Sequence, residues 1–234
     1  MACTIEEDFS KDEFLIAFIS EEDEKKYQAL VKHAQSNWGE ICMEMAQRKV
    51  NGEADFSYYE RQKKKLIYDF DISLLPKILC VVDVDNVYDF SNFFGQTYMV
   101  SQKFKDIVES IEPGVHNFIH FDLMDNMKNK IADYYFFNCK NIVDSINPNV
   151  GNLKRRHEEF EEDKADYYYY YGARSANENN QVLIKEKLDG KACFYELHWD
   201  EEYIFITDEV YQKIQQADLK PLRFGCKFKE QPMS

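Results

Sequence analysis

The spacing of apolar residues changes along this chain, and that change limits the fold more than any other feature of the sequence. Two segments carry the repeat of an amphipathic helix: residues 21–50, and the shorter stretch between Ser101 and Pro113-Gly114. Directly after Gly114 the period becomes two, because Val115 to Asp122 alternate between the two sides that a strand presents. A chain that holds both patterns, without a regular exchange of strand and helix, is typical of the α+β class.

The first helix has a defined beginning and a defined end. Ser20 and Asp23 are spaced as a capping box, and Asn51-Gly52 ends the apolar repeat. One face of this helix must be buried, so Trp38 and Met45 are interpreted as core residues. The second helix begins at Ser101 as its cap and ends at Pro113-Gly114.

Several short apolar segments are predicted as strands, and a third helix is predicted from Thr207 to Ala217. The predicted fold is α+β, a mostly antiparallel sheet with about three helices packed against it. Residues 1–75 are expected to supply an N-terminal strand and the long helix, packed on a core of residues 76–234, with residues 53–76 left open. The predicted strands are 13–19, 78–87, 115–122, 134–139, 181–185, 192–197, 203–206 and 222–228.

The charge and the cysteines limit the partners and the compartment. A formal charge of −14 disfavours nucleic acid and anionic membranes, whose phosphates repel it, and favours a basic protein partner. We find no run near the roughly 18 apolar residues of a membrane span and no signal-peptide pattern at the start, so a cytoplasmic protein is expected. Six widely separated cysteines without a C-x-x-C pair indicate reduced thiols, neither disulfides nor zinc ligands.

No motif in the sequence indicates catalysis, a cofactor or a metal. The phosphate-binding glycine loops, the G-x-S-x-G elbow and H-E-x-x-H are all absent, so the chain is not expected to be an enzyme. The acidic turn with Asp83, Asp85 and Asp89 lacks the glycine and the distal glutamate of a calcium loop. On a strand, His116 and His120 would lie about 13 Å apart, too far to share one metal ion, so both are interpreted as sheet residues.

An acidic run followed by five tyrosines, residues 167–171, stands out in the second half of the chain. One interpretation is structural, with a solvated face and a half-buried strand. The other is a binding epitope in which carboxylates steer a basic partner and tyrosines supply contact area. The candidate contact residues are Glu158, Glu161, Glu162, Asp163, Tyr168 and Tyr170, with Asp83, Asp85 and Asp89 as the second candidate set.

The segment YMVSQKFKDIVESIEPGVHNFIHFDL, residues 98–123, resembles the central signature of family eleven of the bacterial toxin immunity proteins. Further blocks of that family's pattern follow in order, in residues 133–146, 182–197 and 203–224. The resemblance covers roughly residues 75 to 228, and the insert from Lys154 to Asn180 has no fixed family counterpart.

The resemblance implies a polymorphic-toxin immunity protein that is encoded beside its toxin. Type VI or contact-dependent systems deliver such toxins. Tight, stoichiometric inhibition of a cognate toxin is the leading hypothesis, and the acidic charge favours a basic toxin such as a nuclease. An effector adaptor or chaperone, and an enzyme that reverses the toxin's modification, stay open as alternatives. The oligomeric state also stays open, with a homodimer among the alternatives. Because the family motifs resemble fold determinants, the toxin-binding surface is expected in the unshared insert.

Overall fold

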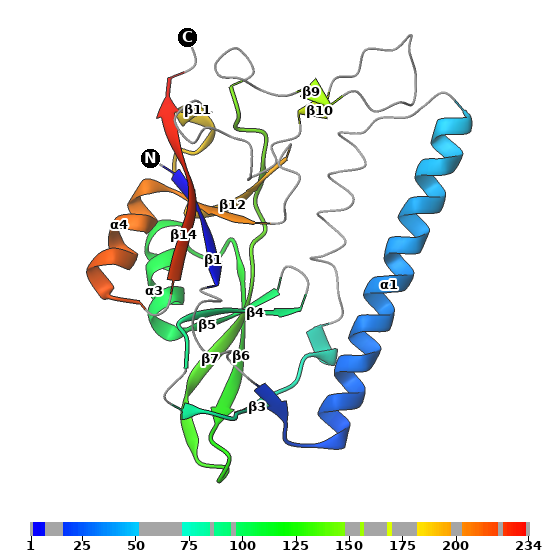
Figure 1. Ribbon diagram of the computed structural model, residues 1–234, viewed down its shortest axis with the longest axis vertical. Helices are drawn as coiled ribbons and strands as arrows, with labels where there is room; N and C mark the ends of the chain where they lie inside the picture. The colour runs from blue at the N-terminus through cyan, green and yellow to red at the C-terminus, as the bar shows by residue number, and fades with distance from the viewer. Residues whose placement is uncertain are drawn as a thin grey trace.

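The computed structural model describes residues 2–7, 16–51, 72–84, 87–94, 97–147, 155–156, 168–169, 182–197, 203–219 and 222–232. Within these ranges the chain forms two six-stranded sheets, a separate two-stranded pair and three α-helices (Figure 1). The helices are α1 (Glu21–Val50), α3 (Gln102–Ile111) and α4 (Asp208–Ala217), and two 3-10 turns, η1 (Ile72–Leu74) and η4 (Lys185–Lys187), accompany them.

The two large sheets, which we name sheet A and sheet B, each combine distant parts of the chain. Sheet A has the strand order β11-β14-β1-β13-β12-β8. Its strands are β1 (Ala2–Glu7), β8 (Ile142–Val143), β11 (Val182–Ile184), β12 (Cys193–Glu196), β13 (Ile204–Ile206) and β14 (Leu222–Gln231). Sheet B has the order β2-β3-β6-β7-β5-β4. Its strands are β2 (Ile16–Phe18), β3 (Ile78–Val81), β4 (Phe90–Phe94), β5 (Thr97–Ser101), β6 (Asn117–Met124) and β7 (Lys130–Asn138).

The prediction of a mostly antiparallel sheet is wrong, because both large sheets are mixed. The pair β3 and β6 is parallel in sheet B, and β8–β12 and β11–β14 are parallel in sheet A. Apolar spacing identifies a strand and its buried face, whereas its direction depends on the connection that leads into it. Between β3 and β6 the chain forms β4, β5 and α3, a crossover long enough to return the strand in the same direction.

Several strands of the two sheets were not predicted. The strand β1 lies at the centre of sheet A, between β14 and β13, although its sequence ACTIEE shows neither an apolar run nor clear alternation. Its residues Ala2 to Ile5 are buried on both sides of the sheet, so the usual alternation is absent. The strand β4, the hairpin partner of β5, and the short strand β8 were also not predicted. The division of the chain at residue 75 stays a prediction.

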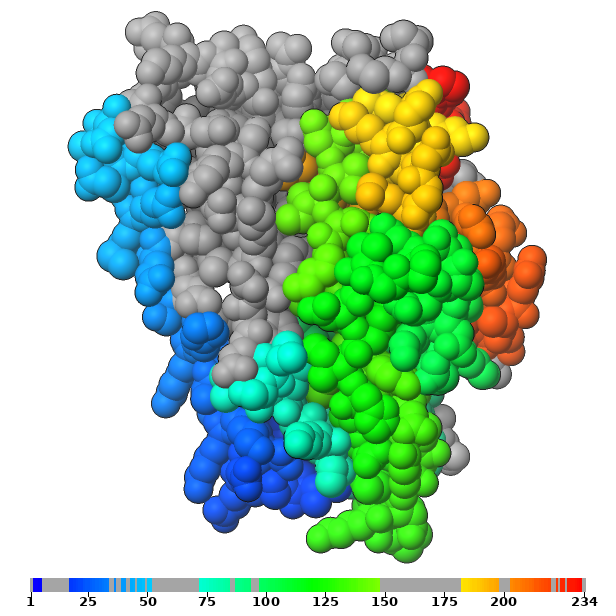
Figure 2. Space-filling view, turned by 180° about the vertical axis from the view of Figure 1, so that it is seen from behind, coloured from blue at the N-terminus to red at the C-terminus, as the bar shows by residue number. Residues whose placement is uncertain are grey.

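The helices lie on opposite sides of the sheets. In Figure 1, α3 and α4 lie next to each other on one side and α1 stands on the other, and Figure 2 shows the same arrangement from behind. Lys213 Nζ of α4 donates to Ser110 Oγ of α3 at 2.9 Å. Apolar residues of α3 and α4 join those of both sheets in the main core. On the far face of sheet B, Leu30 of α1 joins a second core, and the side chains of Trp38 and Met45 lie outside the described residues.

The predicted helix boundaries are confirmed by their hydrogen bonds. Ser20 Oγ accepts the Asp23 N–H at 3.1 Å at the start of α1, and Ser101 Oγ accepts the Phe104 N–H at 3.3 Å at the start of α3. Past the end of α3, Gly114 has φ +70°, the left-handed conformation that favours glycine. Within the described part of the chain no helix is long and apolar enough to cross a membrane.

Gly114 provides a direct stability test. A Cβ at Gly114 would meet no atom within 4 Å, so replacing Gly114 with valine should act through the backbone alone. We expect the free energy of unfolding to fall by about 1–2 kcal/mol. Gly39, inside α1, has equally open space, and Gly39→Ala should instead stabilise by about 0.5–1 kcal/mol. Urea denaturation measures both, and a Gly114→Val chain with unchanged stability but lost toxin protection would make this turn a contact site.

Candidate functional site

The tyrosine run of the insert takes part in a short strand pair. In β9 (Arg155–Arg156) and β10 (Tyr168–Tyr169), Tyr168 pairs with Arg156 and Tyr169 with Arg155, in antiparallel register. The predicted strand character of the tyrosines is therefore present at these two positions. The acidic run lies in sequence between the two strands. Glu158, Glu161, Glu162, Asp163 and Tyr170 lie outside the described residues, as does the side chain of Tyr168.

The second candidate set lies in the connection between β3 and β4. Asp83 is exposed, Asp89 is half-buried directly before β4, and Asp85 lies outside the described residues. The carbonyl of Asp89 accepts the Ser101 N–H at 3.0 Å, which ties it to β5. Burial and then the Asp89 charge raise the pKa of Tyr134. Of the described pair, Asp89 thus has a place in the packing of sheet B, and Asp83 faces solvent.

A buried polar network lies where α3 ends, at the junction of the two sheets. Its centre is the Glu112 carboxylate, whose residue is only 7% exposed. Glu112 accepts hydrogen bonds from the Ala192 N–H at 2.8 Å and from Asn141 Nδ2, which lies 2.9 Å from each carboxylate oxygen. His116 Nε2 lies 3.1 Å from Glu112 Oε2. Asn141 Nδ2 also donates to the Cys193 carbonyl at 2.9 Å, so one carboxylate connects three chain segments.

The hydrogen bonds of His116 define its tautomer. The Lys140 N–H donates to His116 Nδ1 at 3.2 Å, so Nδ1 carries no proton, and Nε2–H is the donor to Glu112. Burial lowers the pKa of His116, and the nearby charge of Glu112 opposes that shift only in part. The imidazole is therefore neutral at pH 7.

The sequence placed His116 in the alternating strand and did not identify its partner. In the structure β6 begins at Asn117, so Val115 and His116 precede the strand; His116 is buried and Val115 is 41% exposed. The reason is the polar network, which holds His116 under the end of α3. A glutamate next to the apolar stripe of α3, four residues before a histidine, was the available signal. The signature residues Glu112 and His116 are thus both buried and hydrogen-bonded to each other.

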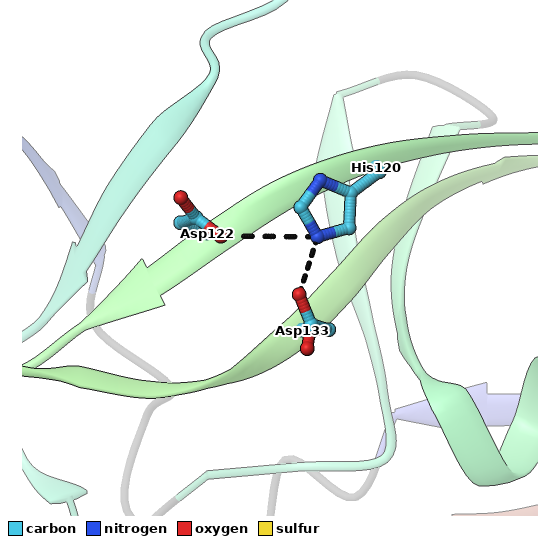
Figure 3. Close-up of side chains that lie close together, drawn as sticks. All are labelled: His120, Asp122 and Asp133. Carbon is cyan, nitrogen blue, oxygen red and sulfur yellow. Dashed lines mark hydrogen bonds and ion pairs between the residues drawn. The ribbon is translucent and has the colours of Figure 1, made fainter.

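An exposed ionic cluster lies on β6 and β7, where Asp122 and Asp133 are paired across the strands (Figure 3). His120 Nε2 lies 2.6 Å from Asp133 Oδ1 and 3.8 Å from Asp122 Oδ1. Lys130 Nζ lies 2.7 Å from Asp122 Oδ1 and 2.8 Å from Asp133 Oδ1. Hydrogen bonds from Lys130 and then His120 hold the pKa of Asp133 below its usual range, and the two aspartates raise that of Lys130.

The ligand atoms of His120, Asp122 and Asp133 lie within 4.8 Å of one another, the one such group among the described residues. The Lys130 ammonium contacts both carboxylates, so a metal ion would have to compete with it for them. We therefore expect the purified chain to hold no stoichiometric zinc after equilibration and desalting, as measured by elemental analysis. Lys130→Met, which removes the ammonium, is the comparison. One zinc per unaltered chain would show that Lys130 does not prevent metal binding at these three residues.

Comparison with known proteins identifies the family. The model described as Immunity protein family (Imm11) matches residues 23–227, and the chain belongs to this family of immunity proteins. The resemblance of the signature is confirmed, and the match is wider than the signature because it begins inside α1 and includes the insert. Family membership assigns the chain to toxin immunity. A search of the curated proteins finds no match.

Proposed function

We propose that this protein binds one cognate toxin in the cytoplasm and inhibits it stoichiometrically, without catalysis. The observation that carries the proposal is membership of the immunity protein family over residues 23–227. The formal charge of −14 supports a basic toxin, such as a nuclease, because complementary charge accelerates association and stabilises the encounter. A toxin delivered between neighbouring cells by a type VI or contact-dependent system would meet the immunity protein in the recipient's cytoplasm.

We propose the insert as the toxin-binding region. Its acidic residues Glu158, Glu161, Glu162 and Asp163 lie in sequence between two paired strands, β9 and β10, the second of which contains Tyr168. A connection between paired strands would present carboxylates close to tyrosines, the combination that steers and then anchors a basic partner. The aspartates of the β3–β4 connection are the second candidate surface.

The test uses the toxin encoded by the gene next to this one. Co-expression should restore growth of cells that produce the toxin, and the purified proteins should form a complex of fixed stoichiometry in which the toxin is inactive. Light scattering of that complex also decides whether one or two copies of this chain take part. A bound toxin that keeps its activity would support an adaptor or chaperone. Protection at substoichiometric amounts would support an enzyme that reverses the toxin's modification.

A further inference from the structure

The network around Glu112 joins two parts of the fold through hydrogen bonds inside the core. Glu112 belongs to the end of α3, whose chain continues into sheet B through β6. Cys193 is the first residue of β12 in sheet A, and Ala192, directly before it, is fully buried. The link therefore depends on the geometry of a few hydrogen bonds inside the core.

The histidine of this network can keep its hydrogen bonds only in the neutral form. His116 Nδ1 accepts the Lys140 N–H, so a second proton on the ring would point at another donor. The side chain of His116 has no exposed surface through which water could accept that proton. Protonation must therefore displace the Lys140 backbone or move the ring.

We propose that Glu112 and His116 form an acid-sensitive latch between the two sheets, which is closed while His116 is neutral and opens when His116 gains a proton. At neutral pH the latch would keep the hydrogen bonds between the two sheets in place. As the solution becomes acidic, these bonds would open and the edge of sheet A would become less stable.

The charged and titratable groups around His116 support this direction. Glu109 lies on α3 and Glu112 at its end, and both charges favour the protonated ring of His116. Lys191, next to β12, disfavours it. Burial exceeds these effects and lowers the pKa of His116. The thiols of Cys139 and Cys193 are fully buried, and burial raises the pKa of both, so neither thiol ionises in mild acid.

The sign of the pH dependence follows from this direction. A histidine whose pKa is lower in the folded chain than in the unfolded chain stabilises the fold above about pH 6.5, the unfolded value. That contribution is lost as the pH falls from this value towards the folded pKa, because the unfolded chain binds the proton first. The limit for one proton is about a tenfold change in the opening equilibrium per pH unit.

The opening should be visible at the edge of sheet A. The connection that carries Lys140 also carries Asn141, whose carbonyl accepts the Tyr195 N–H at 2.9 Å. The next bond of the β8–β12 pair runs from the Leu197 N–H to the Val143 carbonyl at 2.8 Å. Displacement of the connection would therefore expose the Tyr195 and Leu197 amides to exchange before the rest of the fold opens.

The experiment is native-state hydrogen exchange of the full chain at about pH 7 and about pH 5, expressed as protection factors so that the intrinsic exchange rate cancels. We expect protection of the Tyr195 and Leu197 amides to fall by up to about tenfold per pH unit below about 6.5. The Asp122 N–H, which donates to the Lys77 carbonyl at 2.9 Å in sheet B, is the internal control and should lose less.

Matched histidine variants test whether the pH dependence comes from His116. His116→Gln keeps a donor and an acceptor and cannot titrate, so it should remove the pH dependence at Tyr195 whatever its overall stability. His116→Asn is the second variant if the glutamine variant does not fold. His120→Gln removes the exposed histidine of the neighbouring strand and should leave the pH dependence in place. Constant protection of Tyr195 and Leu197 in the unaltered chain, or an unchanged dependence in the His116 variants, would overturn the proposal.

Discussion

Replacing Glu112 with alanine should lower the free energy of unfolding by about 3–5 kcal/mol, a large loss for a single substitution. The substitution leaves two buried donors, the Ala192 N–H and His116 Nε2, without their acceptor, while Asn141 Nδ2 keeps the Cys193 carbonyl as an acceptor. Each buried donor without a partner costs about 1–3 kcal/mol. Urea denaturation at pH 7, followed by circular dichroism, measures the loss.

The control for this prediction is Asp106→Ala on the exposed face of α3, where the aspartate accepts only from Gln102. That substitution should change stability by less than about 0.5 kcal/mol. Glu112→Gln keeps one acceptor oxygen but turns an NH₂ group towards other donors, so its cost should lie between the two. If Glu112→Ala is as mild as Asp106→Ala, the network does not join the sheets.

The helices and most strands could be predicted from the sequence because their signals are local. The caps at Ser20 and Ser101, and the left-handed glycine after α3, depend on a few neighbouring residues and are observed as expected. Strands such as β6 and β7 also showed their apolar spacing directly, although β6 begins after His116.

The mixed direction of the sheets could not be predicted from the sequence, because it depends on residues far apart along the chain. The parallel pair of β3 and β6 places Leu79 opposite Leu123, and nothing in either segment encodes that direction. The central place of β1 follows from pairing with β13 and β14, which are formed about 200 residues later. The burial of Glu112 and His116 has the same origin, since Ala192, a donor of that network, comes from another part of the chain.

The toxin-binding surface is harder to predict than the fold, because it depends on the surface of the toxin, which this sequence does not contain. Composition alone selected the acidic and tyrosine-rich insert. The structure adds the pairing of β9 with β10, in which Tyr168 lies opposite Arg156. The residues that contact the toxin stay a prediction. Their test must therefore separate an effect on toxin binding from an effect on folding.

Charge reversal of the acidic run should slow toxin association. In the combined variant Glu161→Lys, Glu162→Lys and Asp163→Lys, we expect the association rate constant to fall by about tenfold or more at low salt, because steering acts mainly on that rate. The remaining association should depend less on salt, since screening has less attraction to remove. The melting temperature should hardly change. Surface plasmon resonance with the cognate toxin at two salt concentrations measures both rate constants.

Truncation of the tyrosines should act on dissociation instead. Replacing Tyr168 or Tyr170 with alanine should accelerate dissociation by about 30-fold or more, which corresponds to a hot spot of about 2 kcal/mol. Because side chains alternate along a strand, only one parity of the tyrosine run is expected to face the toxin, so Tyr169→Ala is the matched control and should change dissociation less. A tyrosine that packs in the fold would instead lower stability when truncated, which urea denaturation detects. Unchanged kinetics in the charge-reversed and the truncated variants alike would place the toxin elsewhere, and Asp83, Asp85 and Asp89 would then be the next residues to replace.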